Sequence, residues 1–169
     1  MKLTRILKHL VTGSWHAKQL FPKATMNQIE HAIHQAERGH RGEICFVVLP
    51  ALSWLETARG VSPRERAMRA FSDLMVWDTE ENTGVLVFLL LADRDLEIIA
   101  DRGIHSRVNE AVWQQICHQV ENKFKLGEFE AGVLLAIEKI GAVLATHFPA
   151  QKEARQRAGN QLSDKPTIL

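Results

Sequence analysis

Several features that identify common protein classes are scarce or missing in this chain of 169 residues. The two cysteines, Cys45 and Cys117, lie far apart without Cys-x-x-Cys spacing, which excludes a zinc ribbon or a disulfide scaffold. The 21 lysines and arginines are balanced by 20 aspartates and glutamates, so the chain lacks the basic excess of a protein that binds nucleic acid. We therefore expect no nucleic-acid partner.

Membrane and secretion signals are missing as well. No apolar run reaches the roughly 20 residues that cross a bilayer, and the N-terminus lacks the uninterrupted apolar segment of a signal peptide. Unpaired cysteines are normal in the reducing cytoplasm, which is the compartment that we predict. The glycine-rich phosphate loops, the Gly-x-Ser-x-Gly elbow and the His-Glu-x-x-His motif are also absent, so no single motif identifies a chemistry.

Residues 1–22 have the pattern of a basic amphipathic helix. Apolar residues recur at the spacing of a helical turn, with cationic residues between them (Leu3, Ile6, Leu7 and Leu10; Lys2, Arg5 and Lys8). We expect the apolar stripe to dock on the core of the domain or on a protein partner, because a surface helix normally buries its apolar side. A membrane surface is the alternative.

Residues 23–150 alternate between helical and strand patterns, which predicts an α/β domain. Short apolar runs at 43–49 and 85–92 are typical of buried strands, a helical pattern lies between them, and a third strand at 96–100 follows a charged turn. A strand–helix–strand crossover makes the first two strands parallel, and the hairpin adds an antiparallel third. The pattern predicts a three-layer α/β/α sandwich with a small mixed sheet, flanked by N- and C-terminal helices. Residues 151–169 are polar and aperiodic, and we expect a mobile polar tail.

These strand directions gather oxygen ligands at one end of the sheet. The first two strands begin at that end and the third strand finishes there, whereas Asp93 and Asp95 belong to the opposite end. The residues gathered in this way are Glu43, Asp78, Glu80, Glu81, Asn82 and Asp101. Carboxylate and amide oxygens suit Ca²⁺, Mg²⁺ or Mn²⁺. A solvated acidic loop that binds nothing is the alternative.

The segment from Trp77 to Arg94 resembles the TPM domain family. The similar features are Glu43 at the start of a strand, Asn82-Thr83-Gly84 before an apolar strand, the charged turn Asp93-Arg94, and Asp101-Arg102-Gly103-Ile104 after the third strand. The similarity covers the chain from Thr25 to Leu144, and the segments outside it look particular to a bacterial subgroup. The family includes thylakoid-lumen proteins linked to photosystem II repair and modulators of a nematode acetylcholine receptor.

The resemblance implies an α/β/α sandwich, a divalent cation at an acidic cleft, and the acid phosphatase activity of some plant members. The metal ligands would be Glu43, Asp78, Asn82 and Asp101, and the candidate catalytic residues are Asp101, Arg102 and His105. Arg102 would bind phosphate oxygens, and His105 would protonate the leaving group. The alternative is a non-catalytic, metal-stabilised module that recognises another protein through a helical face.

Overall fold

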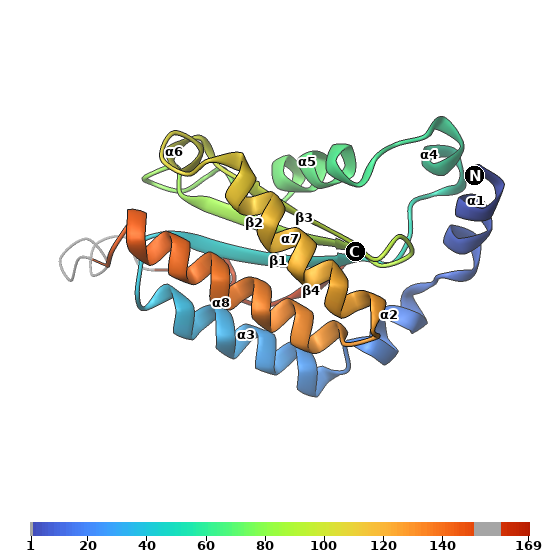
Figure 1. Cartoon of the computed structure of the whole chain (residues 1–169), viewed down its shortest axis with the longest axis horizontal. Coiled ribbons are helices and arrows are strands. Elements are labelled where there is room, and N and C mark those ends of the chain that lie inside the picture. Colours follow the sequence, from blue (N-terminus) through green and yellow to red (C-terminus); the bar gives the residue numbers. More distant parts are fainter. Residues whose placement is uncertain (1, 151–159) are drawn as a thin grey trace.

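A computed structural model describes residues 2–150 and 160–169 of the chain. Its helices and strands are, in chain order, α1 (Lys2–Val11), α2 (Ser14–Leu20), α3 (Lys23–Glu37), β1 (Glu43–Leu49), α4 (Trp54–Arg59), α5 (Pro63–Asp73), β2 (Gly84–Leu90), β3 (Asp95–Ala100), α6 (Arg102–His105), α7 (Glu110–Lys125), α8 (Phe129–His147) and β4 (Thr167–Ile168). They surround one sheet with the strand order β3-β2-β1-β4 (Figure 1).

The sheet is mixed, as the sequence predicts. Strand β1 runs parallel to β2, and β2 runs antiparallel to β3. Strand β2 is buried along its whole length, because helices cover both of its faces. Val87 and Leu89 pack into a core with α3, α7 and α8, whereas Phe88 and Leu90 pack against α5 on the other face. The three-layer α/β/α sandwich is therefore confirmed, with α5 on one side of the sheet and α3 and α8 on the other (Figure 1).

Local capping explains where the crossover helices begin. The Ser62 hydroxyl accepts a hydrogen bond from the Glu65 amide at 3.1 Å, and the Glu65 carboxylate accepts one from the Ser62 amide at 2.8 Å. The same reciprocal pair, formed by Ser53 and Glu56, starts α4. The sequence alone predicts no element for the segment that contains α4.

The N-terminal segment differs from the expected single helix. Residues 1–22 contain two helices, α1 and α2, which are separated at Thr12–Gly13. Of these two helices, only α2 contributes a buried side chain to the hydrophobic core, that of Ala17. Phe21, which directly follows α2, also packs into this core. The expectation that the apolar stripe of the first helix docks on the core is wrong, because Arg5 and His9 face the domain instead and bind Asp93.

The C-terminal prediction is wrong for the part of the tail that the structure describes. Thr167 and Ile168 form β4, which pairs in parallel with Val47 and Val48 of β1. Without β4, this edge of β1 would expose unpaired backbone hydrogen-bonding groups. Strand β4 covers the edge at two residues of β1. The remainder of the predicted tail, residues 151–159, lies outside the described residues.

Candidate functional site

Three strands bring their polar ends together where β1 and β2 begin and β3 finishes. Glu43 is the register partner of Gly84, and the Asp101 amide donates to the Gly84 carbonyl at 2.9 Å. Asp93 lies in the turn at the other end of β2. Glu43 and Asp101 therefore lie at one end of the sheet and Asp93 at the other, as the strand directions predict.

Asp101 is the most constrained carboxylate at this end of the sheet. It caps α6, and its Oδ1 accepts a hydrogen bond from the Arg102 amide at 2.7 Å. The residue is only 7% exposed, and its Oδ2 is buried without a hydrogen-bond partner among the described residues. A buried carboxylate oxygen without a partner is costly, typically by more than 1 kcal/mol. A buried polar atom of this kind calls for an explanation such as a bound ion or an ordered water.

Asn82 is held beside Asp101 by the first turn of α6. Its side-chain oxygen accepts a hydrogen bond from the Arg102 Nε at 2.8 Å, and its carbonyl accepts one from the Gly103 amide at 3.0 Å. Asn82 has a φ of +54°, a left-handed conformation that asparagine tolerates better than most residues. A Cβ at Gly103 would lie 2.5 Å from the Asn82 carbonyl oxygen, so the close approach requires glycine.

The other predicted ligands do not complete a cluster. The carboxylate of the buried Glu43 accepts a hydrogen bond from the Leu162 amide at 3.3 Å, Asp78 and Glu80 are exposed, and Glu81 pairs with Arg41. Within residues 2–150 and 160–169, no three histidine, cysteine, aspartate or glutamate side chains are close enough to hold a metal ion. The structure thus links Asn82 to the first turn of α6, which Asp101 caps, and among the described residues Asp78 joins no cluster of three such side chains.

Comparison with known proteins assigns the family. The family model described as TPM domain matches residues 16–143, most of the chain. The chain belongs to the TPM domain family. The NMR structure of the BA42 protein from the psychrophilic bacterium Bizionia argentinensis is similar to this TPM domain, with a TM-score of 0.74 and 27% identity over 86% of this chain and 93% of that one. No curated protein matches.

Two candidate catalytic side chains of the TPM domain lie at the surface. Arg102 and His105, the first and last residues of α6, are both exposed.

Two other histidines, His31 and His34, lie one turn apart on α3 and are also exposed. No described helix has both the length and the apolar character to cross a bilayer.

A second polar region, which the sequence analysis missed, lies between β3 and α7. A cavity of about 350 Å³ is lined there by Asp95, Glu97, Glu121 and Cys117, among others. Burial, and then the charges of Glu97 and Glu121, raise the pKa of Asp95 to about 7. Burial also raises the pKa of Cys117, so its thiol stays protonated and unreactive at neutral pH. The sequence places Asp95 at the correct end of the sheet but contains no signal for the neighbours that α7 supplies.

Proposed function

We propose that this TPM domain binds one divalent cation, Ca²⁺, Mg²⁺ or Mn²⁺, with the Asp101 carboxylate as its principal ligand. The proposal is supported by one observation above the others, the buried Asp101 Oδ2 that has no partner among the described residues. A cation close to that oxygen would supply the missing interaction. The chemistry fits, because these cations prefer carboxylate and amide oxygens.

The protein contributes few ligands in this proposal. We propose the side-chain oxygen of Asn82, which also accepts a hydrogen bond from the Arg102 Nε, as the second protein ligand beside Asp101. Hard cations commonly complete their coordination with water. Glu43 and Asp78 remain predictions as further ligands. Titrations on the Glu43→Gln and Asp78→Asn variants test them.

Thermal unfolding with and without the ion tests cation binding. An ion that binds only the folded state stabilises it by about 2.7 kcal/mol at a hundredfold excess over Kd, so the melting temperature should rise. Asp101→Asn should abolish this rise. Asp93→Asn is the matched control, because Asp93 lies at the opposite end of the sheet, and it should retain the rise even if the variant is less stable. An equal rise in the chain with Asp101→Asn would show that the ion binds elsewhere or acts by screening.

Hydrolysis of phosphate esters is the activity that we propose for the loaded site. A bound cation polarises a phosphoryl oxygen and lowers the pKa of a bound water. The exposed guanidinium of Arg102 would bind phosphate oxygens, and His105 would protonate the leaving group. The test is hydrolysis of a generic aryl phosphate: chelation, Asp101→Asn and Arg102→Ala should each remove most of the rate. Stabilisation by the ion without any hydrolysis would support the alternative, a non-catalytic module that recognises a protein.

A further inference from the structure

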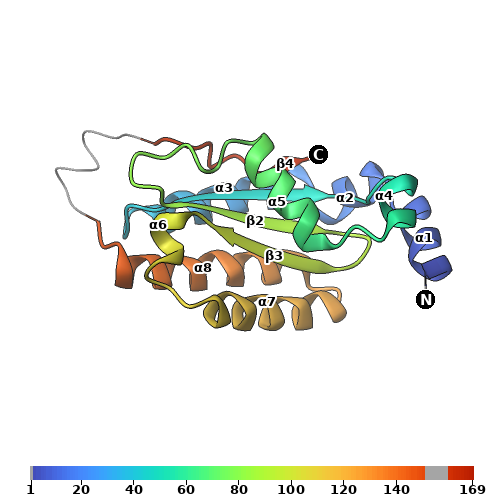
Figure 2. The same ribbon diagram turned by 90° about the horizontal axis from the view of Figure 1, so that it is seen from above.

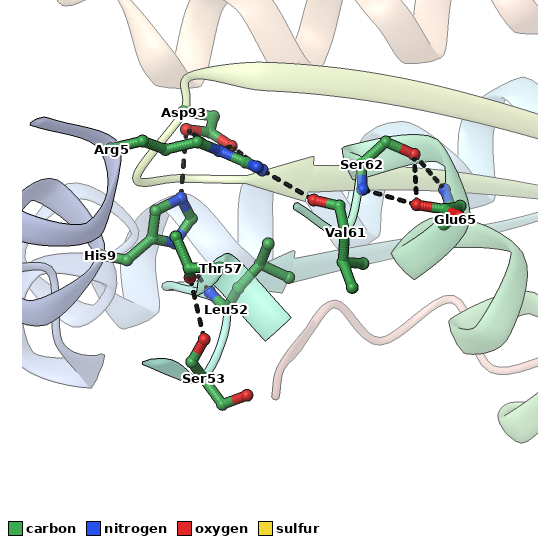
Figure 3. Close-up of polar contacts among 9 residues, drawn as sticks. All are labelled: Arg5, His9, Leu52, Ser53, Thr57, Val61, Ser62, Glu65 and Asp93. Carbon is green, nitrogen blue, oxygen red and sulfur yellow. Dashed lines mark hydrogen bonds and ion pairs between the residues drawn. The ribbon is translucent and has the colours of Figure 1, made fainter. Parts of the chain in front are cut away.

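Helix α1 contacts the rest of the domain through its polar face. Arg5 binds the Asp93 carboxylate through Nε at 3.0 Å and Nη2 at 2.8 Å, and Nη2 also donates to the Val61 carbonyl at 3.0 Å (Figure 3). His9 is 4% exposed; its Nδ1 accepts a hydrogen bond from the Leu52 amide at 2.9 Å, and its Nε2 lies 3.1 Å from Asp93 Oδ1. Because Nδ1 is the acceptor, Nε2 carries the proton and donates to Asp93.

The apolar face of α1 consequently points away from the domain. With 3.6 residues per turn, Leu3, Leu7 and Leu10 lie on the side of the helix opposite Arg5 and His9. Their exposed fractions are 70%, 53% and 64%. A surface helix normally has the reverse orientation, so this helix presents an apolar face with no partner among the described residues.

Two neighbouring helices extend this apolar surface. Helix α4 packs against α1, and α2 follows α1 along the chain at the same end of the molecule (Figures 1 and 2). Seven of the twelve exposed large hydrophobic side chains in the described part of the chain belong to these three helices. We call this surface the apolar end, and it consists of Leu3, Leu7, Leu10, Val11, Trp15, Trp54 and Leu55. A concentration of exposed large hydrophobic side chains at one end of a domain is typical of an interaction site.

The charges around the apolar end are predominantly positive. Residues 1–29 include no aspartate or glutamate, and Lys8, Lys18 and Arg59 are exposed on the three helices. The single carboxylate of these helices, Glu56, caps α4 and lies near two arginines of α5. A second copy of the chain would therefore bring like charges together, which disfavours self-association through this surface.

A cationic recess adjoins the same surface. A cavity of about 590 Å³ lies between α1, α2 and the turn from β2 to β3, and Lys8, His16 and Arg94 line it. Among the described residues that line it, Asp93 is the only carboxylate, and Arg5 and His9 already bind it. An anionic group at this end would meet the cations of Lys8 and Arg94, and no free carboxylate among the described lining residues opposes them.

We propose that the apolar end docks on an anionic lipid surface. An amphipathic helix with leucines on one face and cations beside them lies in the membrane interface, and exposed tryptophans, here on α2 and α4, are enriched at the same depth. The Arg5–Asp93 and His9–Asp93 contacts hold α1 with its apolar face outward. When this face enters the membrane interface, the rest of the domain lies on the aqueous side of α1. This interaction is independent of cation binding at Asp101, which lies at the other end of the sheet.

Co-sedimentation of the full chain with vesicles tests this proposal. Vesicles of phosphatidylcholine with about one third phosphatidylserine should bind the protein, and pure phosphatidylcholine should bind it at least about tenfold more weakly, because each cation near an anionic surface strengthens binding roughly fivefold. Added salt should weaken binding to the anionic vesicles. The Leu7→Ser, Leu10→Ser double variant should lose at least about tenfold in affinity, since it removes apolar surface that enters the interface.

Matched controls separate this effect from unfolding and from self-association. Leu126→Ser changes a leucine directly after α7 that is even more exposed than Leu7 and Leu10, and this variant should bind like the unmodified chain. Circular dichroism should show that both variants are folded, because the altered side chains are exposed. The proposal is overturned if the unmodified chain does not bind anionic vesicles, or if the double variant binds as well as the control. A dimer in solution that the double variant disrupts would instead assign the apolar end to a second copy.

Discussion

The carboxylate of Asp95 should destabilise the folded domain at neutral pH, so that removing its charge increases stability. Asp95 begins β3 and lines the cavity beside α7. Burial, followed by the charges of Glu97, Glu121 and Asp93, raises its pKa from 3.8 to about 7, although Arg5 has an opposing effect. The folded protein therefore retains a proton on Asp95 in a pH range where the unfolded chain has released it.

The sign and size of the effect follow from this pKa difference. The contribution of Asp95 to the free energy of unfolding is most favourable below about pH 4, and it is lost as the pH rises through about 7. A pKa difference of about 3 corresponds to about 4 kcal/mol if nothing else responds. Asp95 is partly exposed, and water screens its charge, so we expect Asp95→Asn to stabilise the domain by about 1–2 kcal/mol near pH 8.

Urea unfolding at two pH values measures this effect. Near pH 8, Asp95→Asn should have the higher free energy of unfolding, and near pH 5 the difference should shrink because the aspartate is then protonated in the folded state. Glu138→Gln, which neutralises an exposed carboxylate on α8, should change little at either pH. An Asp95→Asn variant that is no more stable than the unmodified chain near pH 8 would refute the reasoning.

Two further predictions concern the core and the site. Leu89→Ala should destabilise the domain by about 2–5 kcal/mol in urea unfolding, because the side chain is fully buried in the central strand; a loss well under about 1 kcal/mol would mean that β2 is peripheral. Gly84→Ala should cost at least about 2 kcal/mol, because the new Cβ would lie 1.9 Å from the Val76 carbonyl oxygen. Gly39→Ala, whose Cβ would have ordinary contacts, is its control, and equal effects of the two substitutions would contradict the second prediction.

The sheet was predictable because its signals are local. The apolar runs at 43–49 and 85–92 can be buried only as strands between helices, and the charged turn at Asp93 requires β3 to run backward. Strand direction then determines which residues meet, so the proximity of Asn82 and Asp101 follows from the sequence. The resemblance to the TPM domain family, confirmed by the family comparison, rests on the same segments.

The parts that could not be predicted depend on contacts between distant segments. Helical periodicity shows that α1 is amphipathic but not which face it buries, and that choice is made by Asp93, a partner 84 residues from His9. Strand β4 is too short for a periodic signal and forms because β1 offers a free edge. The unpartnered Oδ2 of Asp101 is a consequence of side-chain packing, which the sequence does not encode in any local pattern.

An NMR titration of the isotope-labelled chain with Ca²⁺ and Mg²⁺ tests cation binding at Asp101 most directly. The proposal predicts that the amide signals of Asn82, Gly84 and Arg102 shift progressively and saturate, while that of Arg94, at the opposite end of the sheet, stays in place. Mn²⁺ should broaden the same three signals if it binds there, because it is paramagnetic. No localised change at millimolar ion, or changes centred on Arg94, would contradict the proposed site.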